Sequence, residues 1–121
     1  MSVKHTTDVK ADEVAAGKGT TIQVLISSQE GGNFAMRKFA MRPGGGMPRH
    51  TNTVEHEQYV LNGHATIGIE DKVYEVEPGD VIFIPEGVPH WYENVGEGVF
   101  EFLCIVPNKN DAVIILDEKN C

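Results

Sequence analysis

The sequence predicts an all-β domain in which many short strands form a sandwich or a barrel. Thirteen glycines and six prolines interrupt the chain at short intervals. The runs between them are rich in Val, Ile, Phe and Tyr, residue types that favour strands. No segment after residue 20 has a convincing helical period.

The expected elements follow one another without a linker or an internal repeat. A polar N-terminal arm, with room for one helical turn, covers residues 1–20; a barrel covers 21–107 and a C-terminal strand segment covers 108–121. The expected strands are 22–26, 34–41, 50–62 with an interruption at 53–55, 65–69, 73–76, 81–84, 90–92, 99–106 and 113–116. The chain has 121 residues, enough for one domain with a real core, so residues 1–121 are expected to form a single domain.

Three details of these strands can be tested. The run Arg42–Gly46 is expected to end the strand 34–41, whose apolar residues fall on both faces. The strand Val81–Ile84 is continuously apolar, which is typical of a strand buried on both faces. In the strand 99–106, the parity of the side chains predicts that Phe100, Phe102, Cys104 and Val106 face inward.

Charge and composition exclude several classes of protein. The formal net charge of −8 disfavours nucleic acid as a partner, because an acidic surface repels phosphates. No segment has the apolar length of a signal peptide or a membrane helix, so no membrane partner is expected. The only cysteines are Cys104 and Cys121, which do not form a disulfide framework, and a reducing cytoplasmic location is therefore expected.

Strand parity sorts the five histidines of the chain. His5 lies in the polar arm, and His64 has the opposite parity to the inward residues of the strand 65–69, so both are expected at the surface. His50, His56 and His90 remain as candidates for the interior. Each of them could be a hydrogen-bonded barrel residue. Imidazole is also the commonest protein ligand for Zn, Cu, Fe and Ni.

Two spaced motifs carry a resemblance to the cupin superfamily. The first consists of Gly44, His50, Asn52, His56 and Gly63. The second consists of Gly79, Pro85, Gly87, His90 and Asn94, and it matches the family pattern at every position. The resemblance covers roughly residues 20–107. It implies a double-stranded β-helix, that is, a jelly-roll or cupin barrel, and a homodimer in which N-terminal strands pair across subunits.

The resemblance also implies a divalent transition metal ion (Mn, Fe, Ni, Co, Zn or Cu) bound by His50, Asn52, His56 and His90. Two of these positions depart from the usual pattern: Asn52 replaces a histidine and His56 replaces a glutamate. An amide oxygen binds transition metals more weakly than imidazole. Asn52 is therefore expected either to be a weak fourth ligand or to hydrogen-bond a water on the ion. The alternative is a polar pocket without metal.

Three further side chains are expected to line this pocket and to take part in chemistry. Tyr92 could donate a proton or a hydrogen bond to a bound oxygen, although its alternative role is that of a core aromatic. Gln58 could orient a ligand. Cys104 could act near the ion, although a buried cysteine is more often inert packing.

Three functions are compatible with such a site. Cupins with histidine-only sites resemble dioxygenases acting on an enolizable or phenolic small molecule, and this metal-dependent enzyme is the preferred hypothesis. A Lewis-acid isomerase or decarboxylase would need a nearby general base, and the sequence contains no obvious one. A non-catalytic cupin that binds or senses a small ligand is the third hypothesis.

Overall fold

The computed structural model describes residues 2–117, which form ten strands and one short 3-10 helix. The elements are η1 (Thr6–Asp8), β1 (Asp12–Glu13), β2 (Lys18–Ile26), β3 (Phe34–Asn52), β4 (His56–Asn62), β5 (Ala65–Ile69), β6 (Lys72–Val76), β7 (Val81–Ile84), β8 (His90–Glu93), β9 (Phe100–Pro107) and β10 (Val113–Asp117). The all-β prediction is confirmed, as is the break between β3 and β4 at residues 53–55. Within this part of the chain, no helix has the length and apolar character needed to cross a membrane.

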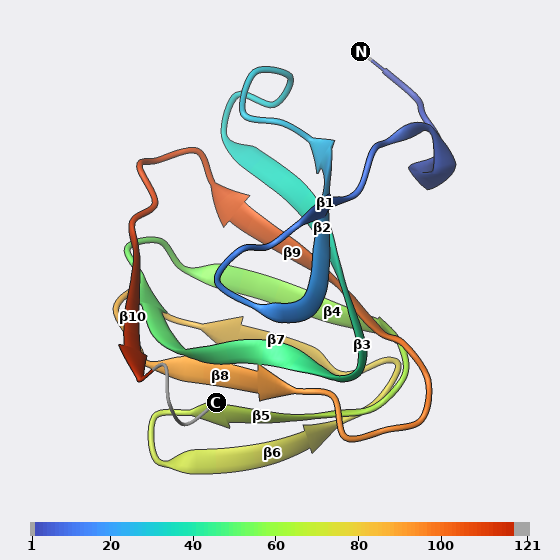
Figure 1. Ribbon diagram of the computed structural model, residues 1–121. Coiled ribbons are helices and arrows are strands. Elements are labelled where there is room, and N and C mark those ends of the chain that lie inside the picture. The colour runs from blue at the N-terminus through green and yellow to red at the C-terminus, as the bar shows by residue number, and fades with distance from the viewer. Residues whose placement is uncertain (1, 118–121) are drawn as a thin grey trace.

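The long strand β3 connects the two halves of the barrel. Its first half, Phe34–Met41, pairs antiparallel with β9 and lies beside β2. Its second half pairs with β8 on one side and with β10 on the other. The hydrogen-bonded order β6-β5-β8-β3-β9-β4-β7 therefore forms one curled sheet whose two halves face each other across a common core (Figure 1). This is the jelly-roll architecture that the sequence predicted.

Two expected boundaries in the first third of the chain were wrong. The run Arg42–Gly46 bends β3 but does not end it, because Gly44 N–H donates to the Asn94 carbonyl and Asn94 N–H donates to the Gly45 carbonyl, both at 2.9 Å. The strand β2 begins at Lys18, which pairs with Gly46, rather than at residue 22. The last residues of the expected arm therefore already belong to the sheet. Residues 118–121 of the expected C-terminal segment lie outside the described residues.

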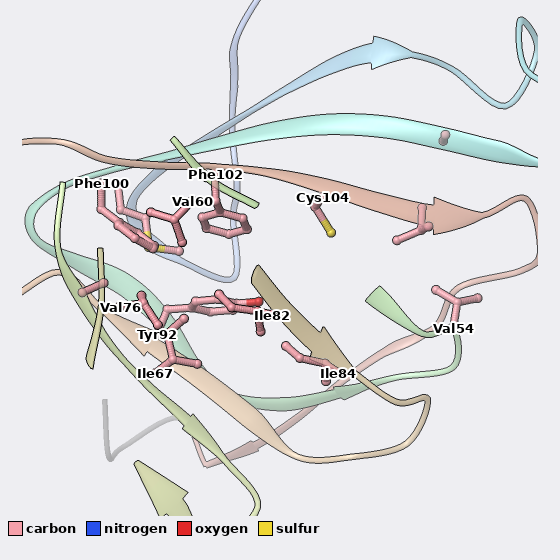
Figure 2. Packing of buried hydrophobic residues seen from close by; sticks show 14 residues of the cluster. Val54, Val60, Ile67, Val76, Ile82, Ile84, Tyr92, Phe100, Phe102 and Cys104 are labelled. Atoms are coloured by element: carbon pink, nitrogen blue, oxygen red, sulfur yellow. The ribbon is translucent and has the colours of Figure 1, made fainter. Parts of the chain in front are cut away.

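The core is built from alternate side chains of the strands. In β9, Phe100, Phe102, Cys104 and Val106 are all buried, which confirms the predicted inward face. The Phe102 ring stacks on Phe39 on one side and on Tyr92 on the other, with 5.2 Å between centroids in both pairs. Figure 2 shows Phe102 above Tyr92, with the sulfur of Cys104 pointing into the same interior. These contacts join β3, β8 and β9 around one apolar centre.

The outer face of the sheet is less covered than the sequence predicted. Val81 is 75% exposed and Phe83 is 56% exposed, so β7 is buried on one face only and the two-faced burial predicted for it was wrong. Phe34 is 59% exposed, so the expectation that both faces of the strand 34–41 are covered was also wrong there. The physical reason is that no element among residues 2–117 covers these side chains, so they face solvent on the outer side of the sheet.

Two motif glycines shape turns at opposite ends of the barrel. Gly63 links β4 to β5 with a φ of 83°, and a side chain there would meet the backbone of Val99 and Phe100. Gly87 has a φ of 78°, and its N–H donates to the Asn52 carbonyl at 2.8 Å. Both conformations are ones that residues with a Cβ rarely adopt. Gly87 thereby fixes the β7–β8 loop against the end of β3, where Asn52 lies.

Candidate metal centre

The structure brings the predicted site residues together inside the barrel. His50 and Asn52 lie at the end of β3, His56 and Gln58 on β4, and His90 and Tyr92 on β8. All six are at most 6% exposed, and the predicted Cys104 on β9 is completely buried. His5 and His64 are exposed, as predicted.

The three interior imidazoles are neighbours. The His90 ring lies between the other two, with its centroid 4.2 Å from that of His50 and 5.9 Å from that of His56. Two imidazoles that ligate one ion at about 2.0–2.1 Å have ring centres roughly 5 Å apart. The observed separations fall on either side of that value. Within residues 2–117, no three His, Cys, Asp or Glu side chains have the geometry of a metal-binding group as they stand.

The hydrogen bonds of the rings determine which nitrogen is free. His50 Nδ1 is 2.7 Å from the Pro48 carbonyl, and His90 Nδ1 is 3.0 Å from the Val88 carbonyl. A carbonyl oxygen only accepts, so each Nδ1 must carry the proton and each Nε2 must keep its lone pair. His56 Nδ1 contacts the sulfur of Cys104 at 3.4 Å, which leaves its Nε2 on the opposite side of the ring. For His50 and His90 this is the tautomer of a metal-binding histidine whose second nitrogen is held by the protein.

Unpartnered buried atoms test whether this donor set fits an ion. Among the described side chains, the buried atoms without a hydrogen-bond partner are His56 Nε2, His90 Nε2, Asn52 Oδ1, Gln58 Oε1 and Arg37 Nε. Buried polar atoms are almost always partnered, so a cluster of unpartnered ones in a single interior needs an explanation. The lone pair of His90 Nε2 and the amide oxygen of Asn52 are electron donors, as a divalent cation requires, and His56 Nε2 becomes a third when its Nδ1 carries the proton. The donor chemistry fits the metal ion that the cupin resemblance implies.

Burial keeps the three imidazoles neutral. Desolvation is the main cause in each case: it lowers the pKa of His50, lowers that of His56 to about 3, and lowers that of His90 to about 4. The nearby Arg37 guanidinium further lowers the pKa of His56, and the carboxylate of Asp111 partly offsets the shift at His50. Because neutral imidazole is the form that binds metal ions, these rings need not lose a proton at neutral pH before they can act as ligands.

The interior of the barrel also contains two weak acids, Tyr92 and Cys104, which Gln58 links. Gln58 Nε2 donates to the Tyr92 hydroxyl at 2.7 Å and lies 3.6 Å from the sulfur of Cys104. Burial raises the pKa of the Tyr92 phenol well above its usual value. Burial likewise raises the pKa of the Cys104 thiol, although Arg37 and Gln58 oppose this shift. Both side chains therefore keep their protons at neutral pH. Since Gln58 donates to the Tyr92 oxygen, the Tyr92 O–H is left to donate elsewhere.

Sequence reasoning missed Asp111, in the loop between β9 and β10. Its carboxylate oxygens each accept a hydrogen bond from Asn52 Nδ2 at 3.3 Å, and one of them also accepts from the Thr53 N–H at 3.3 Å. The Thr53 hydroxyl in turn donates to the Asn110 carbonyl and accepts from the Ala112 N–H. This loop is 59 residues away from Asn52 along the chain, and no local pattern in the sequence indicates the contact.

Sequence reasoning also missed Arg37, which points into the barrel from β3. Its Nη2 lies 3.3 Å from the sulfur of Cys104, and its guanidinium carbon is 5.3 Å from the centre of the Phe39 ring. A signal for this position was available, because Arg37 has the same strand parity as Phe39 and the fully buried Met41. A charged residue on that face is the exception to the apolar pattern.

One surface cavity does not open at the histidines. It has a volume of about 710 Å³ and lies between residues 15–18, the segment 44–49 of β3, the segment 91–93 of β8, and Ile115. The metal-ligand candidates do not line it. It lies in part against Trp91, whose indole packs across Gly68. The buried polar cluster inside the barrel is therefore the better candidate for chemistry, because its unpartnered atoms need ligands.

Comparisons with known proteins agree with this architecture. The crystal structure of the polyketide cyclase RemF from Streptomyces resistomycificus is 36% identical in sequence, with a TM-score of 0.88; the match covers 96% of this chain and 85% of that one. Rru_A2000 from Rhodospirillum rubrum, described as a cupin-2 domain, is 26% identical with a TM-score of 0.83, over 97% of this chain and 81% of that one.

A curated relative is also similar over part of its length. The uncharacterized protein MJ1618 from Methanocaldococcus jannaschii is 36% identical over 52 residues, which are 43% of this chain and 42% of that protein. The match therefore spans less than half of that relative. The family described as "Cupin domain" matches residues 37–106, more than half of the chain and the whole interval that carries both histidine motifs. This chain belongs to the cupin family.

Proposed function

We propose that this cupin is a metal-dependent enzyme that binds a divalent transition metal ion through His50, His56 and His90, with Asn52 as a fourth, weaker ligand. The observation that carries the proposal is the set of buried, unpartnered donor atoms, namely the Nε2 atoms of His56 and His90 and the Oδ1 of Asn52. The hydrogen bonds at Nδ1 hold two of the rings, His50 and His90, in the tautomer that a metal ligand needs. An ion at this position would supply Lewis acidity to a bound oxygen.

The remaining polar groups favour a small enolizable molecule as substrate. No carboxylate is among the proposed ligands, so the site would keep its positive charge and favour an oxyanion such as an enolate. Tyr92 keeps its proton, and Gln58 holds its oxygen at 2.7 Å, so its O–H is available for an oxygen on which negative charge develops. The stacked Phe102 and Tyr92 rings form a flat apolar wall beside these groups.

Ring closure by carbon–carbon bond formation is the reaction we propose. It is supported by the similarity to a polyketide cyclase over 96% of this chain. In such a reaction an enolate carbon attacks a ketone carbon of the same molecule, the ketone oxygen takes up a proton, and water is lost. Tyr92, protonated and buried, is the donor that the pocket offers for that oxygen. The dioxygenase hypothesis is the second candidate, favoured by the three neutral imidazoles that leave coordination positions open.

The exposed face of the sheet supports a homodimer as the working form. Tyr59 and Leu61 of β4 and Val81 and Phe83 of β7 are all 40% or more exposed, and the two strands pair directly. Glu57 lies opposite Phe83 on the same face, so the exposed apolar side chains surround one carboxylate. Exposed apolar side chains gathered in this way are typical of an interface between subunits. Cys104 is a buried free thiol, which agrees with the proposed location in a reducing compartment such as the cytoplasm.

Cobalt titration tests the metal site without knowledge of the substrate. Protein treated with EDTA is expected to bind one Co²⁺ per chain and to develop visible absorption bands. His56→Ala is expected to abolish the bands, while His64→Ala, which removes an exposed histidine, is expected to leave them unchanged. Equal binding by both variants, or no stoichiometric binding by the wild type, would contradict the proposal.

The reaction class is tested with heptane-2,4,6-trione, which closes to 5-methylresorcinol with loss of one water. Metal-loaded protein is expected to accelerate formation of this phenol, followed by chromatography, with no uptake of oxygen in a sealed electrode cell. Consumption of oxygen that depends on His90 would instead support the dioxygenase hypothesis. The same assay with Tyr92→Phe is expected to lower the rate, since the variant keeps the ring and loses the proton donor.

A further inference from the structure

The Arg37 guanidinium is a cation inside the barrel without a carboxylate partner. None of the ion pairs formed by residues 2–117 includes Arg37, although its neighbour Lys38, on the outer face of β3, pairs with Glu101 at 3.2 Å. Arg37 instead contacts the sulfur of Cys104 and the ring of Phe39. Its Nε is buried and has no hydrogen-bond partner.

This arrangement is unfavourable in the protein alone. A thiol sulfur is a weak acceptor, and the buried N–H of a partly buried guanidinium is normally bonded to an acceptor. A side chain kept in such an environment fits a site that is completed by a ligand.

The geometry of the guanidinium indicates the chemical class of this ligand. Nε and Nη2 lie on the same edge of the planar group, and together they form the two-pronged donor that binds a carboxylate. One prong, Nε, is free, and the other meets only the sulfur of Cys104. A carboxylate oxygen is a stronger acceptor than that sulfur and can replace it.

The contacts of Cys104 place this edge of the guanidinium beside the proposed metal centre. Cys104, which Arg37 contacts, also contacts His56 Nδ1 at 3.4 Å and Gln58 Nε2 at 3.6 Å. The Oε1 of Gln58 has no partner and can accept a hydrogen bond from a hydroxyl or an enol. This part of the barrel interior thus offers a donor edge for an anion and an acceptor for a hydroxyl within one set of contacts.

We infer that Arg37 is the anchor for a carboxylate on the substrate, so that the enzyme acts on enolizable keto acids in preference to neutral diketones. This inference builds on the proposed function, since it assumes that the enolizable part of the same molecule faces His50, His56 and His90. The anion site itself requires only Arg37 and its surroundings, and it can be measured whether or not an ion is bound.

Two small probes of the same shape test the inference. Acetoacetate has a carboxylate beside its ketone, and acetylacetone has a neutral acetyl group in its place. Calorimetric titration of zinc-loaded and of EDTA-treated protein is expected to give at least about tenfold tighter binding of acetoacetate in both forms, as for a charge-assisted hydrogen bond. Arg37→Gln is expected to remove this preference. Arg42→Gln, which removes an equal charge from an exposed position of the same strand, is expected to retain it.

The two forms of the protein separate the failure of the inference from that of the proposed function. A preference that depends on Arg37 in EDTA-treated protein supports the anion site even if zinc adds nothing to binding. If the wild type has no preference for acetoacetate, or if Arg37→Gln retains it, the inference is overturned even where zinc tightens the binding of both probes. Arg37→Lys keeps the charge and loses the two-pronged edge, so partial retention of the preference is expected. Urea unfolding of each variant checks that the barrel is intact.

Discussion

The amide nitrogen of Asn52 donates to both carboxylate oxygens of Asp111, at 3.3 Å each. A carboxylate can only accept, so this contact fixes which end of the amide is the nitrogen. The other end, Oδ1, is buried without a partner, as are the Nε2 atoms of His56 and His90. Asp111 therefore keeps the oxygen of Asn52 turned toward the interior of the barrel. This is the orientation that Asn52 needs if it is to ligate a metal ion in place of the usual histidine.

This relationship makes Asp111 a positioning residue, and the first prediction concerns its removal. Asp111→Ala is expected to weaken Zn²⁺ binding about 10-fold to 100-fold, because partners of this kind hold metal ligands in place. Competition with a chromophoric chelator measures the affinity. Asp111→Asn keeps an oxygen that can accept from Asn52 and is expected to weaken binding less. Asp71→Ala, at an exposed turn, is the matched control and is expected to have no effect.

The variant Asn52→His restores the usual ligand of the family and separates two explanations. If Asp111 acts by orienting the amide, Asn52→His should bind Zn²⁺ more tightly than the wild type, and adding Asp111→Ala to it should then change little. A full loss of affinity on adding Asp111→Ala to Asn52→His would mean that Asp111 only supports the loop 108–112.

The fold was predictable because its signals are local. Alternation in the strand 100–106 placed Phe102 and Cys104 inward, and this prediction depends only on the period of a strand, which sequence reveals directly. The spacing of the two motifs, through the cupin resemblance, placed His50, His56 and His90 together in the interior. The continuation of β3 through the run Arg42–Gly46 could not be predicted, because the hydrogen bonds that keep Gly44 and Gly45 in the sheet involve Asn94, which is far along the chain.

The contacts that complete the site are long-range, and this is why sequence reasoning missed them. Asp111 meets Asn52 only because β10 pairs with the end of β3. Arg37 is different, since its parity with Phe39 and Met41 was visible in the sequence. The prediction for that strand considered only its apolar residues and not the single charged side chain, Arg37, on the inner face. The prediction that Val81–Ile84 is buried on both faces was wrong, because a run of apolar residues does not reveal whether the covering layer belongs to the same chain.

The second prediction concerns the aromatic stack at the centre of the barrel. Phe102→Ala removes a ring that is 2% exposed and lies between Phe39 and Tyr92. The free energy of unfolding is expected to fall by roughly 3–5 kcal/mol, since a large cavity remains. Phe34→Ala, at a site that is 59% exposed, is the control and is expected to change it by less than about 1 kcal/mol. Urea unfolding followed by far-ultraviolet circular dichroism measures both; equal effects would contradict the burial of Phe102.

The third prediction is that the metal-free protein loses stability as the pH falls below about 6.5. The pKa of His56 is lowered to about 3 and that of His90 to about 4, whereas the same imidazoles titrate near 6.5 in the unfolded chain. Between these values the unfolded chain binds protons that the folded chain does not, so acid favours unfolding. The free energy of unfolding is expected to fall by roughly a few kcal/mol from pH 7 to pH 4.5, since the folded protein relaxes partly around a protonated imidazole.

Urea titrations at a series of pH values, after EDTA treatment, measure this slope. Glu57, whose pKa is raised to about 7 by its hydrogen bond with Glu55, acts in the opposite direction, because its stabilising contribution is lost as the pH rises toward 7; its largely solvated position keeps the effect small. His90→Gln is expected to reduce the acid slope, while His64→Gln, at the exposed position, should leave it as in the wild type. A slope that is identical in all three proteins would show that the interior imidazoles do not govern acid unfolding.

The fourth prediction is that the outer face of β4 and β7 forms a dimer. Phe83 is 56% exposed and Val81 is 75% exposed, and beside them lie the exposed Tyr59 and Leu61. A second copy would cover this face, and stable interfaces bury about 800 Å² on each partner.

Light scattering after size-exclusion chromatography is expected to give twice the chain mass for the wild type and one chain mass for Phe83→Asp, because a charge in an apolar interface is left unsatisfied. Val73→Asp puts the same charge on β6, at a side chain that is 61% exposed, and should remain dimeric. If the wild type is a monomer, or if Val73→Asp dissociates while Phe83→Asp does not, the exposed apolar run in β7 needs a different explanation.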